Sequence, residues 1–306
     1  MTRNNPLQPL LAALPPLPAS LPSGTGRAFG TCGELAQGQF DSGEDFLVTL
    51  PVDLWSEVRV TMVPTAPSVT QSRSLSEKSK TCLAIRKALD YLGFPEWGAV
   101  FQVRSEIPEG KGMASSSADI VAACRAVSAA LNLPLSAEEI SRIAVSIEPT
   151  DGVMYAGSVC YNHRWGRLLE TLGNLPPARL LVADLGGQVD TVAFNQIPKD
   201  YTAAERGKIR RAYELIRSGI RMKDLAQIGL GATLSAEVNQ RILPKPHFET
   251  FLRIAREYGA SGVCAAHSGT VLGLMFAARM AHRIAAARQA LSNVIGGIRL
   301  FETQTL

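Results

Sequence analysis

The chain has 306 residues, of which 46% are hydrophobic and 19% charged, a balance typical of one large or two modest globular domains. Its formal net charge of +4 is a weak bias, and no basic run of the kind that follows a nucleic-acid backbone is present. The five cysteines and four histidines lack the spacing of metal or redox motifs, which predicts reduced thiols in a cytoplasmic protein. No apolar run approaches the ~20 residues that cross a bilayer.

Closely spaced prolines over residues 1–24 predict a flexible leader, because proline breaks helices. Beyond it, hydrophobic periodicity predicts strands and helices. In the first half we expect, in order, a glycine-punctuated segment at 27–38, an extended run at 45–50, a strand at 56–64, a polar loop at 65–80, a helix at 81–92, a strand at 98–105, and helices at 118–131 and 136–147. Ser136 and Glu139 have the spacing of a capping box at the start of the last helix.

The second half restarts after a linker at residues 173–177. We expect a strand at 178–184, helices at 203–218, 224–239 and 248–258, strands at 262–266 and 271–276, a helix at 279–291, and a strand at 297–303. These elements alternate without the regular repeat of a doubly wound sheet, so the predicted fold class is α+β. The predicted domains are residues 25–173 and 174–306.

The most informative segment is PEGKGMASSSAD, at residues 108–119. Its glycines allow close backbone approach, and the helix that begins among the serines directs N–H groups and a positive helix end at one point. Any single serine has the plain alternative of a helix cap. The whole string predicts a phosphate site formed by Gly110, Lys111, Gly112, Met113, Ala114, Ser115, Ser116 and Ser117. Walker, Rossmann and protein-kinase signatures are absent from the sequence.

Three segments occur in the order of the GHMP kinase motifs and resemble them. Residues 108–118 resemble the second motif, while RAFGTCGELAQGQ at 27–39 and SGVCAAHSGTVLG at 261–273 are similar to the first and the C-terminal motifs. The resemblance covers about residues 25–306. It departs at Thr31 and Cys32, where many relatives have a lysine, and leaves open whether Lys111 supplies that charge.

The resemblance implies a two-domain GHMP kinase fold, with an N-terminal domain like domain 2 of ribosomal protein S5 and a ferredoxin-like C-terminal domain. It also implies ATP and Mg²⁺, with the metal held by Ser115, Ser116 and Glu148. Asp151 would be the catalytic residue, accepting the acceptor's proton or orienting its hydroxyl, and an ordinary pKa near ~3.9 would keep it ionised. The plain alternative for both acids is a helix end with solvated carboxylates.

The acceptor contacts are predicted from three short segments, each with a structural alternative such as a turn acid or a loop cap. A Gly-Gly loop that ends in Asp-Thr could hold an ammonium or a carboxylate, and the first and C-terminal motifs supply the other candidates. The candidates are Glu34, Asp190, Thr191, His267, Ser268 and Gly269.

Four short sequences resemble those of the L-threonine kinase branch of the family: KGMASSSAD, EPTDG, GGQVDT and HSGTVLG. That branch implies a cytoplasmic enzyme that makes O-phospho-L-threonine for the aminopropanol linker of cobalamin. Its partner would be a small hydroxy amino acid, with neither nucleic acid nor membrane, and a homodimer stays open. The alternatives are homoserine kinase, another GHMP small-molecule kinase, or a catalytically inactive ATP-binding sensor.

Overall fold

A computed structural model describes residues 21–64, 66–72, 78–187, 189, 197, 199–280 and 282–306. Its strands are β1 (Ser23–Gln39), β2 (Asp45–Val63), β3 (Val69–Gln71), β4 (Gly98–Ser105), β5 (Ser158–Asn162), β6 (Arg167–Gly173), β7 (Ala178–Asp184), β8 (Gly262–Ala265), β9 (Val271–Ala277) and β10 (Arg299–Gln304). Its helices are α1 (Ser79–Tyr91), α2 (Ser115–Leu131), α3 (Ala137–Val145), α5 (Ala203–Met222), α6 (Leu225–Ile242), α7 (Phe248–Tyr258) and α8 (His282–Val294), with a 3₁₀ turn, η1 (Ala278–Met280).

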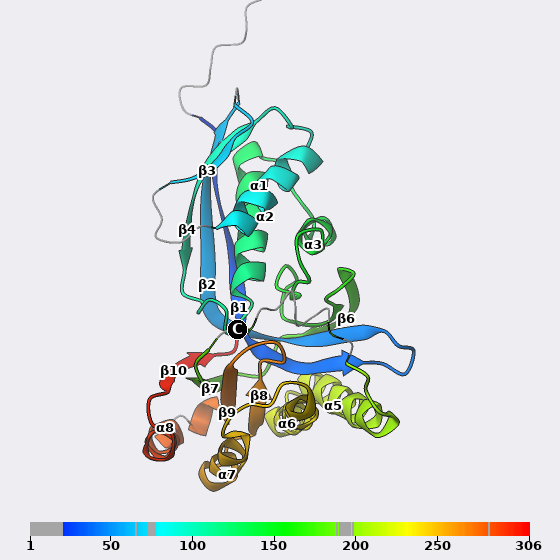
Figure 1. Ribbon diagram of the computed structural model, residues 1–306, viewed down its shortest axis with the longest axis vertical. Helices are drawn as coiled ribbons and strands as arrows, with labels where there is room; N and C mark the ends of the chain where they lie inside the picture. The colour runs from blue at the N-terminus through cyan, green and yellow to red at the C-terminus, as the bar shows by residue number, and fades with distance from the viewer. Residues whose placement is uncertain are drawn as a thin grey trace, which may run out of the picture.

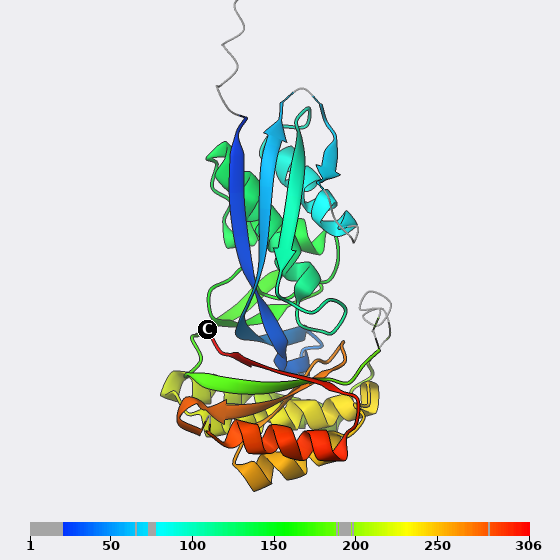
Figure 2. The same cartoon turned by 90° about the vertical axis from the view of Figure 1, so that its left-hand side faces the viewer.

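The molecule is elongated, with α1–α3 beside β1–β4 in its upper part and α5–α8 beside β7–β10 in its lower part (Figure 1). The strand order is β10-β7-β9-β8-β1-β2-β4-β3, and β5 pairs with β2 and β6 away from this path. The long antiparallel strands β1 and β2 run from the upper part into the lower one, as the view in Figure 2 shows. Glu34 of β1 pairs with Ala265 of β8, so the sheet connects the two parts.

Helix α2 lies directly against β1, and small residues permit this close approach. A Cβ atom built on Gly26 of β1 would overlap the carbonyl oxygen of Ala122 in α2, so only glycine fits there. Ala118, Ala122 and Ala126 of α2 are fully buried. Close packing of this kind tolerates little displacement, which fixes the position of the N-terminal end of α2 against the sheet.

Every predicted helix is present, and the capping box of Ser136 and Glu139 is confirmed. The helix expected at 279–291 is divided into η1 and α8. The glycine-punctuated segment at 27–38 is part of β1. Its glycines allow close approach of other elements, since a Cβ on Gly33 would meet the Ala265 backbone of β8 and one on Gly38 would meet Ile209 of α5. Strands β5 and β6 were not predicted, and β3 lies inside the expected polar loop.

The fold class is confirmed as mixed α and β structure. Residues 1–20 of the predicted leader lie outside the described residues, and Ser23 and Gly24 already belong to β1. The boundary expected between residues 173 and 174 falls on the connection from β6 to β7, and the division into two domains there stays a prediction. Within the described ranges, no helix is long and apolar enough to cross a membrane.

Candidate active site

A cavity of about 370 Å³ opens at the N-terminal end of α2. In the loop before the helix, Gly110, Gly112 and Ala114 have φ angles of 70°, 78° and 60°, so the backbone turns sharply before α2 begins. Ala114 is the N-cap residue, and no side chain caps the helix by a hydrogen bond. The alternative of a serine-capped helix is therefore wrong. The first N–H groups of α2 lack a side-chain acceptor beside the cavity, an arrangement that suits a phosphate group.

Most of the predicted phosphate loop lines this cavity. The lining residues from the loop are Gly110, Gly112, Met113, Ala114, Ser115, Ser116 and Ser117. Lys111 was predicted to be part of the phosphate site, but it is not among the residues that line the cavity. Its ammonium lies 3.0 Å from Oδ2 of Asp184 and donates to the carbonyl oxygen of Gly187 at 2.8 Å. Lys111 thus links the loop to the end of β7, and its side chain does not supply the charge that the first motif lacks.

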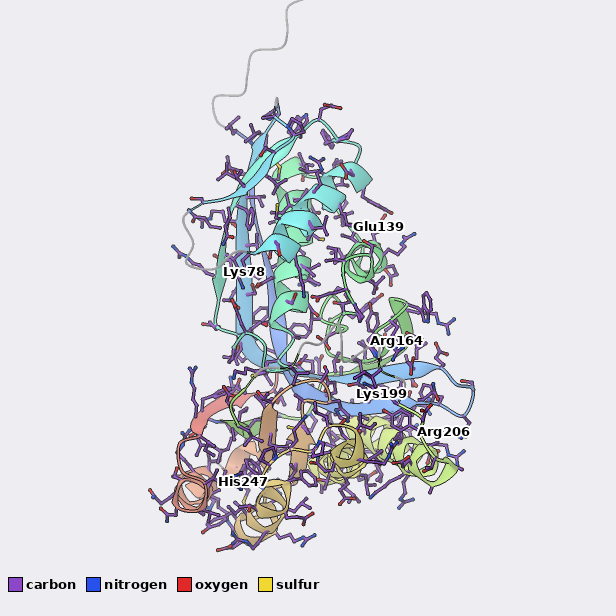
Figure 3. All side chains as sticks on the ribbon, viewed as in Figure 1. Lys78, Glu139, Arg164, Lys199, Arg206 and His247 are labelled. Atoms are coloured by element: carbon purple, nitrogen blue, oxygen red, sulfur yellow. The ribbon has the colours of Figure 1, made fainter. Side chains whose placement is uncertain are left out.

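We call the part of the cavity lined by the loop before α2 the phosphate end. Two other lysines border it, and the sequence did not identify either of them. Lys78 precedes α1 (Figure 3). It pairs with Glu109 and with Asp119, whose Oδ2 lies 2.8 Å from the ammonium. Lys80, in the first turn of α1, pairs with Glu148. Both lysines line the cavity, so the cationic charge comes from the start of α1. They fall in a polar run whose composition predicts only a loop.

The consecutive serines at the start of α2 have different partners, because successive helical residues point in different directions. The Ser116 hydroxyl donates to Glu148. The Ser117 hydroxyl donates to Oδ2 of Asp151 at 3.0 Å and accepts from the Asp151 backbone N–H at 3.1 Å. Ser115 also lines the cavity. The predicted acids are therefore brought to the helix end from the segment that follows α3.

The predicted metal ligands can be tested against the donors present. Glu148 is 6% exposed and, with Ser116, offers one carboxylate and one hydroxyl at the cavity wall. Magnesium commonly takes one or two carboxylates and completes its shell with substrate phosphates and water. The donor set thus fits Mg²⁺ held jointly by protein and nucleotide. In the described ranges, no group of three His, Cys, Asp or Glu side chains forms a metal cage.

Asp151 differs from the expectation in its protonation. Burial, followed by the negative charge of Glu34, raises the pKa of Asp151 to about 7, although the hydrogen bond from Ser117 lowers it. The prediction of an ordinary pKa near ~3.9 for Asp151 is therefore wrong. A carboxylate with a pKa near neutrality is well matched to accepting a proton at physiological pH.

We call the part of the cavity lined by Glu34 and Ser268 the acceptor end, because the predicted acceptor contacts lie there. It contains a buried hydrogen-bond network between residues that are far apart in the sequence. Glu34 is 4% exposed, and its Oε2 accepts the His267 backbone N–H at 2.8 Å and Nδ1 of the same histidine at 3.0 Å. Nε2 of His267 lies 2.9 Å from the Ser235 hydroxyl, which also accepts the Gln37 backbone N–H at 3.1 Å. Of the predicted acceptor contacts, Glu34 and Ser268 line the cavity, whereas His267 is not among the lining residues and contacts Glu34 through its ring.

Three lining residues at this end carry buried polar atoms without a hydrogen-bond partner in the described part of the chain. They are Oε1 of Gln37, Oγ1 of Thr150 and Nδ1 of His163. Burial lowers the pKa of His163 to about 3, so its ring is neutral. Buried polar groups are normally paired, and unpaired ones beside a cavity mark places where a ligand can supply the partner. The sequence analysis singled out none of the three.

The remaining predicted residues are placed as follows. Gly269 packs against the phosphate loop, and the neighbouring Thr270 N–H donates to the carbonyl oxygen of Lys111 at 3.0 Å. Asp190 and Thr191 lie outside the described residues. Val189, from the same predicted segment, lines the cavity.

A second cavity, of about 390 Å³, lies further along the β1–β2 pair and is bordered by Arg164, Lys199 and Arg206 (Figure 3). Asp45 lies 3.1 Å from the Arg164 guanidinium. The two cavities share no lining residue among those described. A residue that lines the second cavity can therefore be replaced without replacing a residue that lines the first.

Comparison with known proteins gives the same family for both halves of the chain. Residues 79–159 match the GHMP kinases N terminal domain, and residues 212–293 match the GHMP kinases C terminal domain. The L-threonine kinase of Salmonella typhimurium is 33% identical over 249 residues, covering 80% of each chain. That of Citrobacter freundii is 32% identical over 250 residues, covering 80% of this chain and 83% of its own.

Solved structures agree on the fold. A homoserine kinase from Cytophaga hutchinsonii superposes with a TM-score of 0.70 at 17% identity, covering 95% of this chain and 96% of its own. The L. major mevalonate kinase, solved with R-mevalonate, gives a TM-score of 0.68 at 17% identity, covering 94% and 97%. The family domains, the relatives and the fold agree, and the chain belongs to the GHMP kinases as an ATP-dependent phosphotransferase.

Proposed function

We propose that the enzyme transfers the γ-phosphoryl group of ATP to the side-chain hydroxyl of L-threonine and releases ADP and O-phospho-L-threonine. The observation that carries this proposal is the hydrogen bond between Ser117 and Asp151. It sets a carboxylate beside the predicted phosphate loop, at the point where the cavity continues into a polar acceptor end. The similarity to two L-threonine kinases supports threonine as the acceptor.

In this mechanism the loop before α2 holds the phosphates, and Asp151 faces the acceptor hydroxyl. The hydroxyl oxygen forms a bond to the γ-phosphorus while the bond from that phosphorus to the bridging oxygen of ADP breaks. The hydroxyl proton passes to Asp151, whose raised pKa favours receiving it. Glu148 and Ser116 would hold Mg²⁺, which neutralises phosphate charge during the transfer.

The family resemblance also suggests how the product is used in metabolism. O-phospho-L-threonine would enter the assembly of the aminopropanol linker of cobalamin, in the cytoplasm. The five cysteines form no disulfide in the described part of the chain, which is consistent with a reducing compartment. A homodimer remains a separate prediction, which the mechanism does not require.

The test is ADP release measured with purified enzyme, ATP and Mg²⁺, using L-threonine, L-homoserine and L-serine in parallel. We expect kcat/KM to be highest for L-threonine, with phosphothreonine identified by mass spectrometry. A preference for L-homoserine would replace the proposed acceptor and leave the phosphotransferase chemistry intact. If ATP binds and none of the three hydroxy amino acids is phosphorylated, the proposal fails and the sensor alternative gains support.

A further inference from the structure

Lys78 contacts both ends of the predicted phosphate loop. Its ammonium pairs with Glu109, the residue before Gly110, and lies 2.8 Å from Oδ2 of Asp119, near the start of α2. Lys78, Glu109 and Asp119 all line the cavity. The ammonium is therefore held by residues on both sides of the segment that we expect to bind the phosphates of ATP.

Asp119 is a buried and firmly held partner of this ammonium. Its side chain is 4% exposed. Oδ1 of Asp119 accepts the hydroxyl of Ser56, and Oδ2 accepts the Lys78 ammonium. Ser56 is fully buried and belongs to β2, an interior strand of the sheet. Separating a buried charge from its partner is strongly unfavourable, so Asp119 keeps the ammonium in one place.

Glu109 pairs with the same ammonium but is held much less firmly. Its side chain is 58% exposed, and among the described residues its carboxylate makes no hydrogen bond or ion pair except the one with Lys78. An exposed ion pair contributes little to stability, because water and salt screen it. The contact between Glu109 and Lys78 can therefore be broken at small cost, whereas the contact between Asp119 and Lys78 cannot.

The Lys78 ammonium stays charged in this setting. Burial alone would lower the pKa of Lys78, but the hydrogen bonds to Asp119 and Glu109 raise it above its ordinary value. A charged ammonium at the cavity wall forms strong hydrogen bonds to phosphate oxygens. A phosphate group and the Glu109 carboxylate at the same ammonium repel each other, so the more weakly held anion is displaced.

We propose that Asp119 positions the Lys78 ammonium for the phosphates of ATP, and that Glu109 competes with these phosphates for the same ammonium. Asp119 is thus a positioning residue, because it acts on the nucleotide through Lys78. Glu109 lowers the affinity for ATP although it lines the site. The inference concerns the nucleotide alone, so it does not depend on the identity of the acceptor.

The test measures, by calorimetry and without an acceptor, the dissociation constant of a non-hydrolysable ATP analogue with Mg²⁺. Glu109→Gln and Asp119→Asn are each made in the wild type and in Lys78→Met, at a temperature at which denaturant unfolding shows every variant to be folded. Glu257→Gln is the matched control. Glu257 is 53% exposed, pairs with Arg253 in α7 and lines neither cavity.

We expect Glu109→Gln to bind the analogue about threefold more tightly, because the competing anion is removed. Asp119→Asn should bind it about tenfold more weakly, because the ammonium loses its fixed and charged partner. Glu257→Gln should stay within about 1.5-fold of the wild type. In the Lys78→Met background, Glu109→Gln should no longer tighten binding, and Asp119→Asn should no longer weaken it.

Unchanged or weaker binding by Glu109→Gln would overturn the competition. So would equal tightening in the Lys78→Met background, which would indicate direct repulsion between Glu109 and the nucleotide. Unchanged binding by Asp119→Asn, or the same loss with and without Lys78, would overturn the positioning role. Because no acceptor is present, these outcomes are independent of whether the enzyme phosphorylates L-threonine, and the two proposals can fail separately.

Discussion

Gly112 and Gly269 touch backbone to backbone across the cavity wall, which joins the phosphate loop of the first half to the glycine-rich motif of the second. A Cβ atom on Gly112 would lie 2.8 Å from Cα of Gly269, and one on Gly269 would overlap the carbonyl oxygen of Lys111. These positions must stay glycine for the loop to keep its shape. The two family motifs are thus one structural unit at the phosphate end.

This contact predicts that Gly269→Ala destabilises the loop and weakens ATP binding. The added methyl group meets backbone that cannot move without opening the cavity, and overpacking of this kind costs about 1–3 kcal/mol. Denaturant unfolding and calorimetric ATP binding measure the two effects. Gly296→Ala is the control, because a Cβ there meets no atom within 4 Å. Equal stability of the two variants would contradict the prediction.

A second prediction distinguishes Ser116 from Ser115 as the serine that binds Mg²⁺. Ser116→Ala removes a hydroxyl bonded to Glu148, so the Mg²⁺ concentration needed for half-maximal activity should rise about tenfold. Ser115→Ala, at the matched neighbouring position, should shift it less, because no hydrogen bond to Glu148 is lost. Activity is titrated with Mg²⁺ at fixed ATP. A larger shift for Ser115→Ala would reassign the metal ligand.

Lys78 and Lys80 should respond differently to replacement by methionine. Lys78→Met leaves the Asp119 side chain, 4% exposed, without its cation and should cost about 3 kcal/mol of unfolding free energy. The Lys80 side chain is 45% exposed, so Lys80→Met should change stability by less than about 1 kcal/mol.

Both lysine variants should raise KM for ATP about tenfold, because each removes a cation from the phosphate end. Chemical denaturation and initial rates measured on the same preparations distinguish the two effects. An unchanged KM for ATP in both variants would show that neither lysine contacts the nucleotide.

The phosphate loop could be predicted because its physical basis is local. Glycines at 110 and 112, small residues after them and an alanine-rich helix all occur within one short segment. Even so, the sequence did not show that the N-cap residue of α2 is Ala114 rather than a serine. Ala114 has a left-handed backbone, with φ of 60°, and it follows a loop in which Gly112 packs against Ala266 and Gly269 of the second half of the chain.

The acceptor end could not be predicted from the sequence, because its residues come from segments that are far apart in the chain. Glu34 and His267 are hydrogen-bonded at a separation of 233 residues, and no local pattern encodes such a pairing. His163 is a lone histidine in the sequence, and only the structure shows that it is buried at the cavity wall. Tertiary packing decides which polar residues lose water, and that loss distinguishes a ligand contact from a surface residue.

Asp151→Asn should lower kcat about 100-fold or more, because the amide keeps the size of the side chain but cannot accept the proton. ATP affinity should change by less than about threefold, since in the proposed mechanism Asp151 faces the acceptor hydroxyl and does not contact the nucleotide. Single-turnover rates and nucleotide binding test this prediction. Loss of ATP binding with an unchanged rate per bound nucleotide would contradict the assigned role.

The raised pKa of Asp151 predicts a specific pH profile. Because the ionised form accepts the proton, kcat/KM should rise with pH through an inflection near 7 and then level off. The hydrogen bond from Ser117 lowers the pKa of Asp151, so Ser117→Ala should move the inflection to higher pH. Ser115→Ala, which leaves that bond intact, should not move it. An inflection that stays in place or falls in Ser117→Ala would show that another group controls the profile.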